Sequence, residues 1–244
     1  MSVDITGAKI LLRLPFGIAI TETQVNMWIV MLVIALLCKW LTQNLQIKPA
    51  GKRQVIAEYL VNLANKFVKE NMGEAFKEFA PFIAALFSLA LFCSLSSLFG
   101  MYPPTADLNT TLGWAIVVFL MIMYFKIKTN GILGYLKGLT EPIPVFTPFN
   151  IIGEFSTPIS MAFRMFGNVS SGVVISALVY AALAWLSTVV LQWLPEVIAN
   201  IPLLQLGLPA ILSIYFDLFS GVLQAFIFCM LTMLYVSSAA SKDK

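Results

Sequence analysis

The longest apolar stretch of the sequence sets the tightest limit on the fold. It runs from Phe149 to Leu194, and between Phe155 and Pro195 its only formal charge is Arg164. As one α-helix this stretch would be about 60 Å long, whereas the hydrocarbon core of a bilayer is about 30 Å thick. It therefore either turns back near "FGN" at 166–168 as two short spans, or crosses the membrane as one steeply tilted helix.

The remaining apolar segments identify an all-α integral membrane protein. Hydrophobic residues make up 59% of the chain and charged residues 11%, which is far from the balance of a soluble domain. The segments are continuous, whereas the strands of a membrane barrel would alternate apolar and polar positions. We predict a single membrane domain over 1–244 with an outer N-terminal segment (1–24), spans at 25–41, 79–100 and 112–127, and two long, strongly tilted helices at 149–194 and 208–240.

Residues 50–78, between the first two spans, show a helical repeat of apolar side chains such as Val55, Tyr59 and Leu63. Charged residues, among them Glu58 and Lys66, occupy other faces. This pattern predicts an amphipathic helix lying in the cytoplasmic interface. A connecting helix with a solvated face explains the same pattern.

The basic residues favour one tilted crossing at 149–194, and so about five transmembrane helices in all. With the N-terminus outside, every Lys and Arg except Lys9, Arg13 and Arg164 is then cytoplasmic, as the positive-inside rule prefers. Two short spans would instead place Lys242 and Lys244 outside. The first residues lack the pattern of a removable signal peptide, so we expect a multi-pass protein of a bacterial plasma membrane with a cytoplasmic C-terminus.

Metal and cofactor sites are not expected. The chain has no histidine, and Cys38, Cys93 and Cys229 form no CxxC pair, so the usual ligands of a structural zinc site are missing. We predict that all three cysteines are buried as small apolar side chains.

Arg164 is the residue that most needs an explanation. A charge deep in a bilayer costs from about 2.5 to over 10 kcal/mol, so such a side chain normally faces protein or water. A polar stripe accompanies it on one side of the predicted helix. Its members are Ser156, Ser160, Arg164, Asn168 and Ser171. Gly167 and Ser171 would let another backbone approach.

The last helix offers polar residues that could face Arg164. Asp217 and Gln224 are seven residues apart and share a side, and in an antiparallel pair Gln224 would lie near the depth of Arg164. An acid, an amide and a fixed cation, without a nucleophile or metal ligands, indicate an ion route rather than a bond-making site. No nucleotide chemistry is expected on this chain.

Four segments together resemble subunit a of F-type ATP synthases. They are "PPTADLNTTLGWAIVVF" at 103–119, "PFNIIGEFSTPISMAF" at 148–163, "RMFGN" at 164–168 and "LQAFIFCMLTMLYVS" at 223–237. The resemblance implies a membrane stator that passes protons or Na⁺ through two half-channels to the carboxylates of a ring of c subunits. Arg164 matches the arginine that prevents leakage and couples ion flow to rotation, and hence to ATP synthesis or hydrolysis.

The resemblance also implies further pathway residues and partners. Asn168 and Gln224 match polar positions beside the arginine, Asp217 a position in the outer half-channel, and Glu154 an acid on the cytoplasmic approach, near Ser160. Asp107 and Asn109 match a motif of an outer loop. The implied partners are the c ring, the peripheral-stalk b subunits, the soluble ATPase head and membrane lipids, with no nucleic acid.

Two departures from the family pattern make the outer channel poor in charge. Gly172 and Val173 stand where many members carry an acid, and Thr157 replaces a commonly basic residue. The main alternative is a secondary ion transporter with a buried Arg and Asp pathway. Such transporters often show paired repeats with interrupted helices, and the sequence shows no such pair.

Overall fold

The computed structural model describes residues 7–13, 15, 19–43, 45–46, 51–140, 143–191 and 214–241. Its described helices confirm the all-α membrane class, because five of them are long and apolar enough to cross a membrane. Two short strands, β1 (Ile10–Arg13) and β2 (Ala19–Thr21), pair antiparallel ahead of the first helix. This hairpin lies within the predicted outer segment 1–24, where no pattern in the sequence predicts it.

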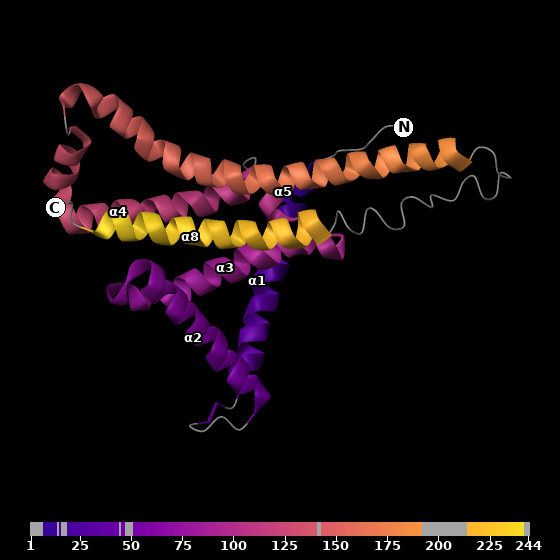
Figure 1. The fold of residues 1–244 in the computed structure, drawn as a ribbon, viewed down its shortest axis with the longest axis horizontal. Helices are drawn as coiled ribbons and strands as arrows, with labels where there is room; N and C mark the ends of the chain where they lie inside the picture. The colour runs from indigo at the N-terminus through magenta and orange to yellow at the C-terminus, as the bar shows by residue number, and fades with distance from the viewer. Residues whose placement is uncertain are drawn as a thin grey trace.

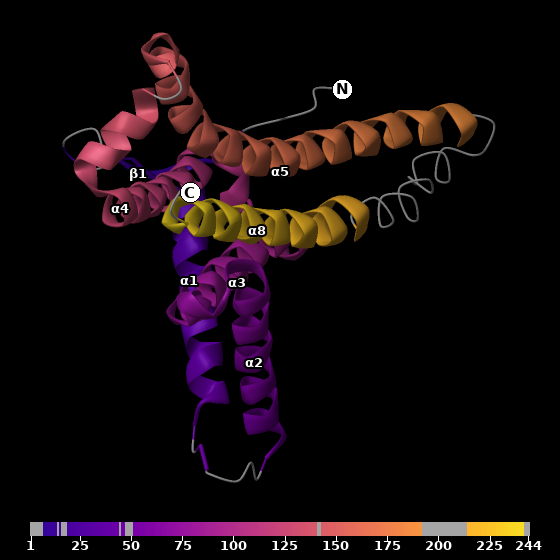
Figure 2. The ribbon, with the colours of Figure 1, turned by 60° about the vertical axis from the view of Figure 1, so that its left-hand side comes forward.

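The first helices form an arm. α1 (Glu22–Leu41) leads away from the other helices and α2 (Lys52–Met72) returns beside it, as Figures 1 and 2 show. The arm is tied at its far end by the Arg53 guanidinium, which lies 4.4 Å from the centre of the Trp40 ring. α2 is not among the described helices apolar enough to span a membrane, and its place in an interface stays a prediction.

Glycines end or bend two of the next elements. α2 ends at Gly73, whose φ of 89° is open to glycine at little cost. η2 (Glu74–Phe79), α3 (Ala80–Leu95) and η3 (Ser96–Phe99) follow, then η4 (Pro104–Ala106) and α4 (Leu108–Thr140). α4 extends well beyond the predicted span at 112–127, and inside it Gly131 has a φ of 72° that breaks the helical geometry. The part of α4 after Gly131 therefore turns away from the part before it.

The two long helices are each continuous over the described residues. η5 (Pro144–Phe146) leads into α5 (Thr147–Leu191), so the long apolar stretch is one helix and does not turn back near 166–168. η7 (Ile214–Phe219), a π-helix, leads into α8 (Ser220–Ala240). The parts of the two predicted helices at 192–194 and 208–213 lie outside the described residues. α5 and α8 run antiparallel and side by side, roughly across the direction of α1 (Figures 1 and 2).

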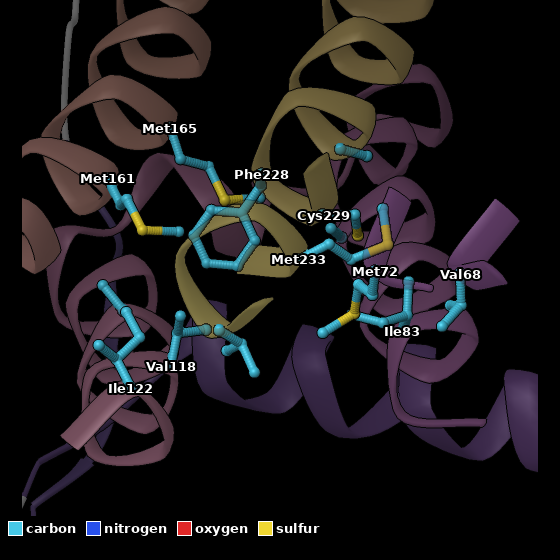
Figure 3. Close-up of a cluster of buried hydrophobic side chains, with 14 of the residues drawn as sticks. Val68, Met72, Ile83, Val118, Ile122, Met161, Met165, Phe228, Cys229 and Met233 are labelled. Carbon is cyan, nitrogen blue, oxygen red and sulfur yellow. The ribbon is translucent and has the colours of Figure 1, made fainter. Parts of the chain in front are cut away.

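The hydrophobic core is centred on α8, which contacts α2, α3, α4 and α5. Figure 3 shows Met161 and Met165 of α5 pointing toward the ring of Phe228, and Ile83 of α3 near Met233. All five of these side chains are at most 2% exposed. Cys93 and Cys229 are buried as predicted, but Cys38 is exposed on α1, because no described helix covers that side of the arm. The prediction that all three are buried is therefore wrong for Cys38.

Candidate functional site

Arg164 lies on the face of α5 that points away from the bundle. Met161, Ala162 and Met165 form the opposite, fully buried face, whereas the side chains of Arg164 and its neighbours Ser160 and Phe163 are exposed. Gly167 belongs to the same open surface, since a Cβ placed there would meet nothing within 4 Å. The predicted close approach of another backbone at Gly167 is therefore not made by the described part of this chain.

One turn beyond Arg164, polar side chains join α5 to α8. The Asn168 amide donates to the Gln224 side-chain oxygen at 3.5 Å, and the Ser220 hydroxyl donates to the Asn168 side-chain oxygen at 3.0 Å. Gln224 is only 3% exposed, so its amide depends on such partners. The residue that meets Gln224 across the helix pair is thus Asn168, while Arg164 stays on the open face.

A close helix contact next to Ser220 brings buried hydroxyls near this junction. A Cβ on Gly221 would lie 3.1 Å from the Ser94 Cβ, so α8 and α3 nearly touch there. The Ser94 hydroxyl lies 3.4 Å from that of Thr105 in η4, and both residues are buried. Polar groups therefore extend from the junction of α5 and α8 toward the loop before α4.

In that loop, Asp107 is held by neutral donors. The Thr23 hydroxyl donates to one carboxylate oxygen at 2.7 Å, and the Asn109 backbone N–H donates to the other at 3.0 Å. Asp107 thereby caps the N-terminus of α4, where an anion is favoured. We call Thr23, Tyr102, Thr105, Asp107 and Asn109 the Asp107 cluster. Partial burial, and then the charges of Asp107 and Glu22, raise the pKa of Tyr102.

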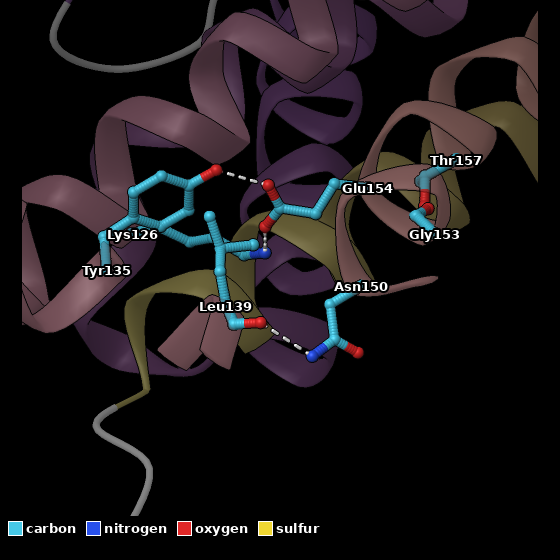
Figure 4. A network of polar contacts seen from close by, with 7 residues as sticks. All are labelled: Lys126, Tyr135, Leu139, Asn150, Gly153, Glu154 and Thr157. Carbon is cyan, nitrogen blue, oxygen red and sulfur yellow. Dashed lines mark hydrogen bonds and ion pairs between the residues drawn. The ribbon is translucent and has the colours of Figure 1, made fainter. Parts of the chain in front are cut away.

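Glu154 lies near the start of α5, on the wall of a cavity of about 540 Å³ between α4, α5 and the end of α8. Lys126 pairs with one of its carboxylate oxygens and the Tyr135 hydroxyl donates to the other, as Figure 4 shows. The Glu154 side chain is 15% exposed and that of Lys126 33%. Asn150, also on this wall, donates to the Leu139 carbonyl oxygen at 2.9 Å. We call this space the Glu154 cavity.

The predicted site residues thus fall into separate places. Asn168 and Gln224 meet at the helix junction, Glu154 lies in its cavity, and Asp107 with the Asn109 backbone lies in the Asp107 cluster. Ser160 and Arg164 are exposed on α5. The backbone of Asp217 belongs to η7, and its side chain lies outside the described residues.

The sequence alone does not reveal the partners of the two carboxylates. The charge distribution places Lys126 only among the cytoplasmic basic residues, and no pattern singles out Tyr135 or Thr23. Lys126 and Glu154 are 28 residues apart, and Thr23 and Asp107 are 84 residues apart. No periodicity within one helix could reveal these pairs. The only signal is the polarity of Lys126, at the end of the predicted span 112–127, and of Tyr135 beyond it.

Comparisons with known proteins agree with the sequence resemblance. The family model described as "ATP synthase A chain" matches residues 24–237. "ATP synthase subunit a, sodium ion specific" of Propionigenium modestum is 33% identical over 240 residues, which cover 92% of this chain and 75% of the relative. "ATP synthase subunit a 1" of Crocosphaera subtropica is 32% identical over 237 residues, which cover 96% and 94%. "ATP synthase subunit a" of Desulforamulus reducens is 31% identical over 234 residues, which cover 93% and 82%.

Proposed function

Because the chain belongs to the ATP synthase A chain family, and so to the ion-translocating membrane sector with the c ring as its partner, we propose that it passes ions through two half-channels separated by Arg164. The family assignment disfavours the secondary transporter. In this proposal the chain is the stator, with the N-terminus outside and the C-terminus in the cytoplasm of a bacterium. The peripheral stalk and the soluble head complete the complex.

One observation carries the proposal: Arg164 is exposed on a helix face that carries no other charge near it. A guanidinium keeps its charge at any physiological pH, and a charge facing lipid is costly. A partner surface carrying a carboxylate would remove that cost. The open surface at Gly167 would let such a partner approach closely. The c ring, with its ion-binding carboxylates, is the partner that the family supplies.

The positions of the two acids on the long helices support two routes. Glu154 lies near the start of α5 and Asp217 just before the start of α8. Because α5 and α8 are antiparallel (Figure 1), the two acids belong to opposite ends of the helix pair. Arg164 lies between these ends, one turn before Asn168, which contacts the first residues of α8. We assign the Glu154 cavity, with Ser160 beyond it, to the cytoplasmic half-channel. Asp217 and the Asp107 cluster are assigned to the outer half-channel.

The proposed role of Arg164 follows from electrostatics. Its positive charge attracts an ionised ring carboxylate and favours loss of the bound ion, since an opposite charge stabilises the ionised form. The same charge repels a cation moving directly between the half-channels. Ion flow then requires the ring to turn, with Asn168 and Gln224 as the uncharged neighbours that the ion passes. A lysine would serve less well, because burial can lower its pKa.

The test is ATP-driven ion uptake into inverted membrane vesicles, followed for H⁺ and for Na⁺. We expect Arg164→Ala to reduce uptake to background while the assembled complex still hydrolyses ATP. Arg13→Ala is the matched control, since Arg13 is exposed on β1, and it should keep wild-type uptake. Uptake by Arg164→Ala at the wild-type rate would contradict the proposal.

A further inference from the structure

Glu154 is unusual among the acids of the described chain because both of its oxygens are occupied by side chains of one helix. Lys126 and Tyr135 both belong to α4, and they reach the carboxylate from opposite sides of the Gly131 break. The non-helical geometry at Gly131 turns the second half of α4 so that Tyr135 faces α5 (Figure 4). The backbone of α4 is thus shaped to bring two donors to one carboxylate.

Among the residues that the structure describes, the surroundings of this carboxylate contain little other charge. The titratable side chains on the described cavity wall are Glu154, Lys126 and Tyr135, together with Tyr235 from α8. The other described lining residues are uncharged, and several are polar, including Asn130, Asn150 and Ser238. Lys126 is therefore the cation that balances Glu154 within the described cavity wall.

An unbalanced carboxylate on the wall of a cavity large enough for several water molecules would hold a cation. A tethered ammonium changes this in two ways: it repels a second cation and it occupies one of the two carboxylate oxygens. An entering proton or Na⁺ must then compete with Lys126 for Glu154. Conduction needs a site that binds firmly enough to admit an ion and weakly enough to release it.

We propose that Lys126 is a positioning residue that sets the cation affinity of the Glu154 cavity by acting as a tethered competitor for its carboxylate. Tyr135 assists by occupying the second oxygen. The inference rests on the proposed function, since it assumes that ions pass through this cavity. It adds a residue that determines how tightly the cavity holds the ion, which is distinct from the coupling role of Arg164.

The experiment measures ion flux in vesicles carrying the whole complex, with cation concentration varied on each face in turn. The readout is the half-saturating concentration of H⁺ and of Na⁺. We expect Lys126→Gln to lower this concentration about tenfold for the transported ion, the lower end of what a neighbouring opposite charge does to a carboxylate. The change should occur only on the face that carries the soluble head, with no rise in the maximal rate.

Three variants separate this effect from a structural one. Lys126→Arg keeps the charge and should restore the wild-type value within about twofold. Lys128→Gln removes the same charge from an exposed position on α4, where Lys128 lies 5.7 Å from the Tyr124 ring centre, and should change nothing. Adding Glu154→Gln to Lys126→Gln should abolish the gain in affinity, because the carboxylate that binds the ion is then gone.

An unchanged half-saturating concentration in Lys126→Gln overturns the inference, even if the rate falls. Should that variant fail to assemble, Tyr135→Phe decides: it removes one donor and should lower the half-saturating concentration in the same direction, about twofold to threefold. A value equal to that of wild type would again overturn the inference. Failure of the proposed function is seen separately, as uptake that survives Arg164→Ala.

Discussion

α5 and α8 lie side by side and are equally apolar, yet the bundle uses them in opposite ways. The most apolar stretch within Pro144–Ser187, which covers most of α5, has a mean hydropathy of 1.9, and the most apolar stretch of α8 has a mean hydropathy of 1.8. In α8, 44% of that stretch is buried inside the chain, but in α5 only 6% is. Hydropathy therefore indicates that both helices are apolar enough to cross a membrane, but it does not indicate which of them is surrounded by the other helices of the chain.

The polar residues of the two helices show the same contrast. α8 turns Gln224 and Thr232 inward, where both are at most 3% exposed, and the Thr232 hydroxyl donates to the Phe228 carbonyl oxygen at 2.8 Å. α5 presents Arg164 outward. We interpret α8 as the fixed support of the pair and α5 as the surface offered to a moving partner.

The largest expected effect tests burial directly with the same substitution on each helix. Phe228 is 1% exposed and Phe163 is 53% exposed. Phe228→Ala should lower the free energy of unfolding by about 3 kcal/mol, because it leaves a cavity among packed side chains. Phe163→Ala should cost less than about 0.5 kcal/mol, as usual for a surface change. Unfolding of the purified chain in detergent measures both values.

Similar losses for the two variants would break the comparison, since they would mean that Phe163 is packed as tightly as Phe228. In the assembled complex Phe163→Ala has a second readout. If α5 faces the c ring, this variant should weaken retention of the ring during purification, whereas the isolated chain stays as stable as wild type.

The sequence predicted the features that depend on one segment at a time. The apolar character of α5, its one basic residue, Arg164, and the polar position of Asn168 all follow from residues 149–194 and are seen in the structure. Contacts between distant segments could not be predicted in this way. Asn168, rather than Arg164, meets Gln224, because the rotation of α5 about its axis is set by the packing of Met161 and Met165 against Phe228.

The carboxylates illustrate the same limit. That Glu154 pairs with Lys126 depends on how α4 lies against α5, and that Tyr135 joins them depends on the turn at Gly131. The Asp107 carboxylate looked equally available from sequence, yet it binds a buried hydroxyl and the start of α4. Glu154 therefore lies on a cavity wall beside the Lys126 ammonium, whereas Asp107 is part of the hydrogen bonding that holds the fold together.

A smaller effect is expected from removing the charge of either acid assigned to the proposed outer half-channel. Asp217→Asn should reduce ion flux about a hundredfold, the lower end of what loss of a proton-transferring group costs. Asp107→Asn should reduce it less than about twofold, because an amide oxygen can still accept the Asn109 N–H. Flux in vesicles at equal amounts of assembled complex measures both. Equal and mild reductions would show that the turn before α8 carries no transport group.

The smallest expected effect compares two glycines of the pair. Gly→Ala in a helix gains about 0.5–1 kcal/mol from backbone entropy if the new methyl group fits. Nothing lies within 4 Å of a Cβ on Gly167, whereas a Cβ on Gly221 would lie 3.1 Å from the Ser94 Cβ. Gly167→Ala should therefore raise the free energy of unfolding of the isolated chain. The free energy of unfolding of Gly221→Ala should be about 1 kcal/mol lower than that of Gly167→Ala, which is the lower end of the usual cost of overpacking.

A second change shows whether contact with α3 causes that difference. Ser94→Gly removes the atom that meets the new methyl group, so it should rescue Gly221→Ala, while Ser94→Ala keeps that atom and should not. In the assembled complex, Gly167→Ala should be harmful although it stabilises the isolated chain. If the c ring packs against this open face of α5, a methyl group that stabilises the isolated chain should slow coupled ion flux. A variant that is both more stable and fully active would mean that the partner keeps its distance at Gly167.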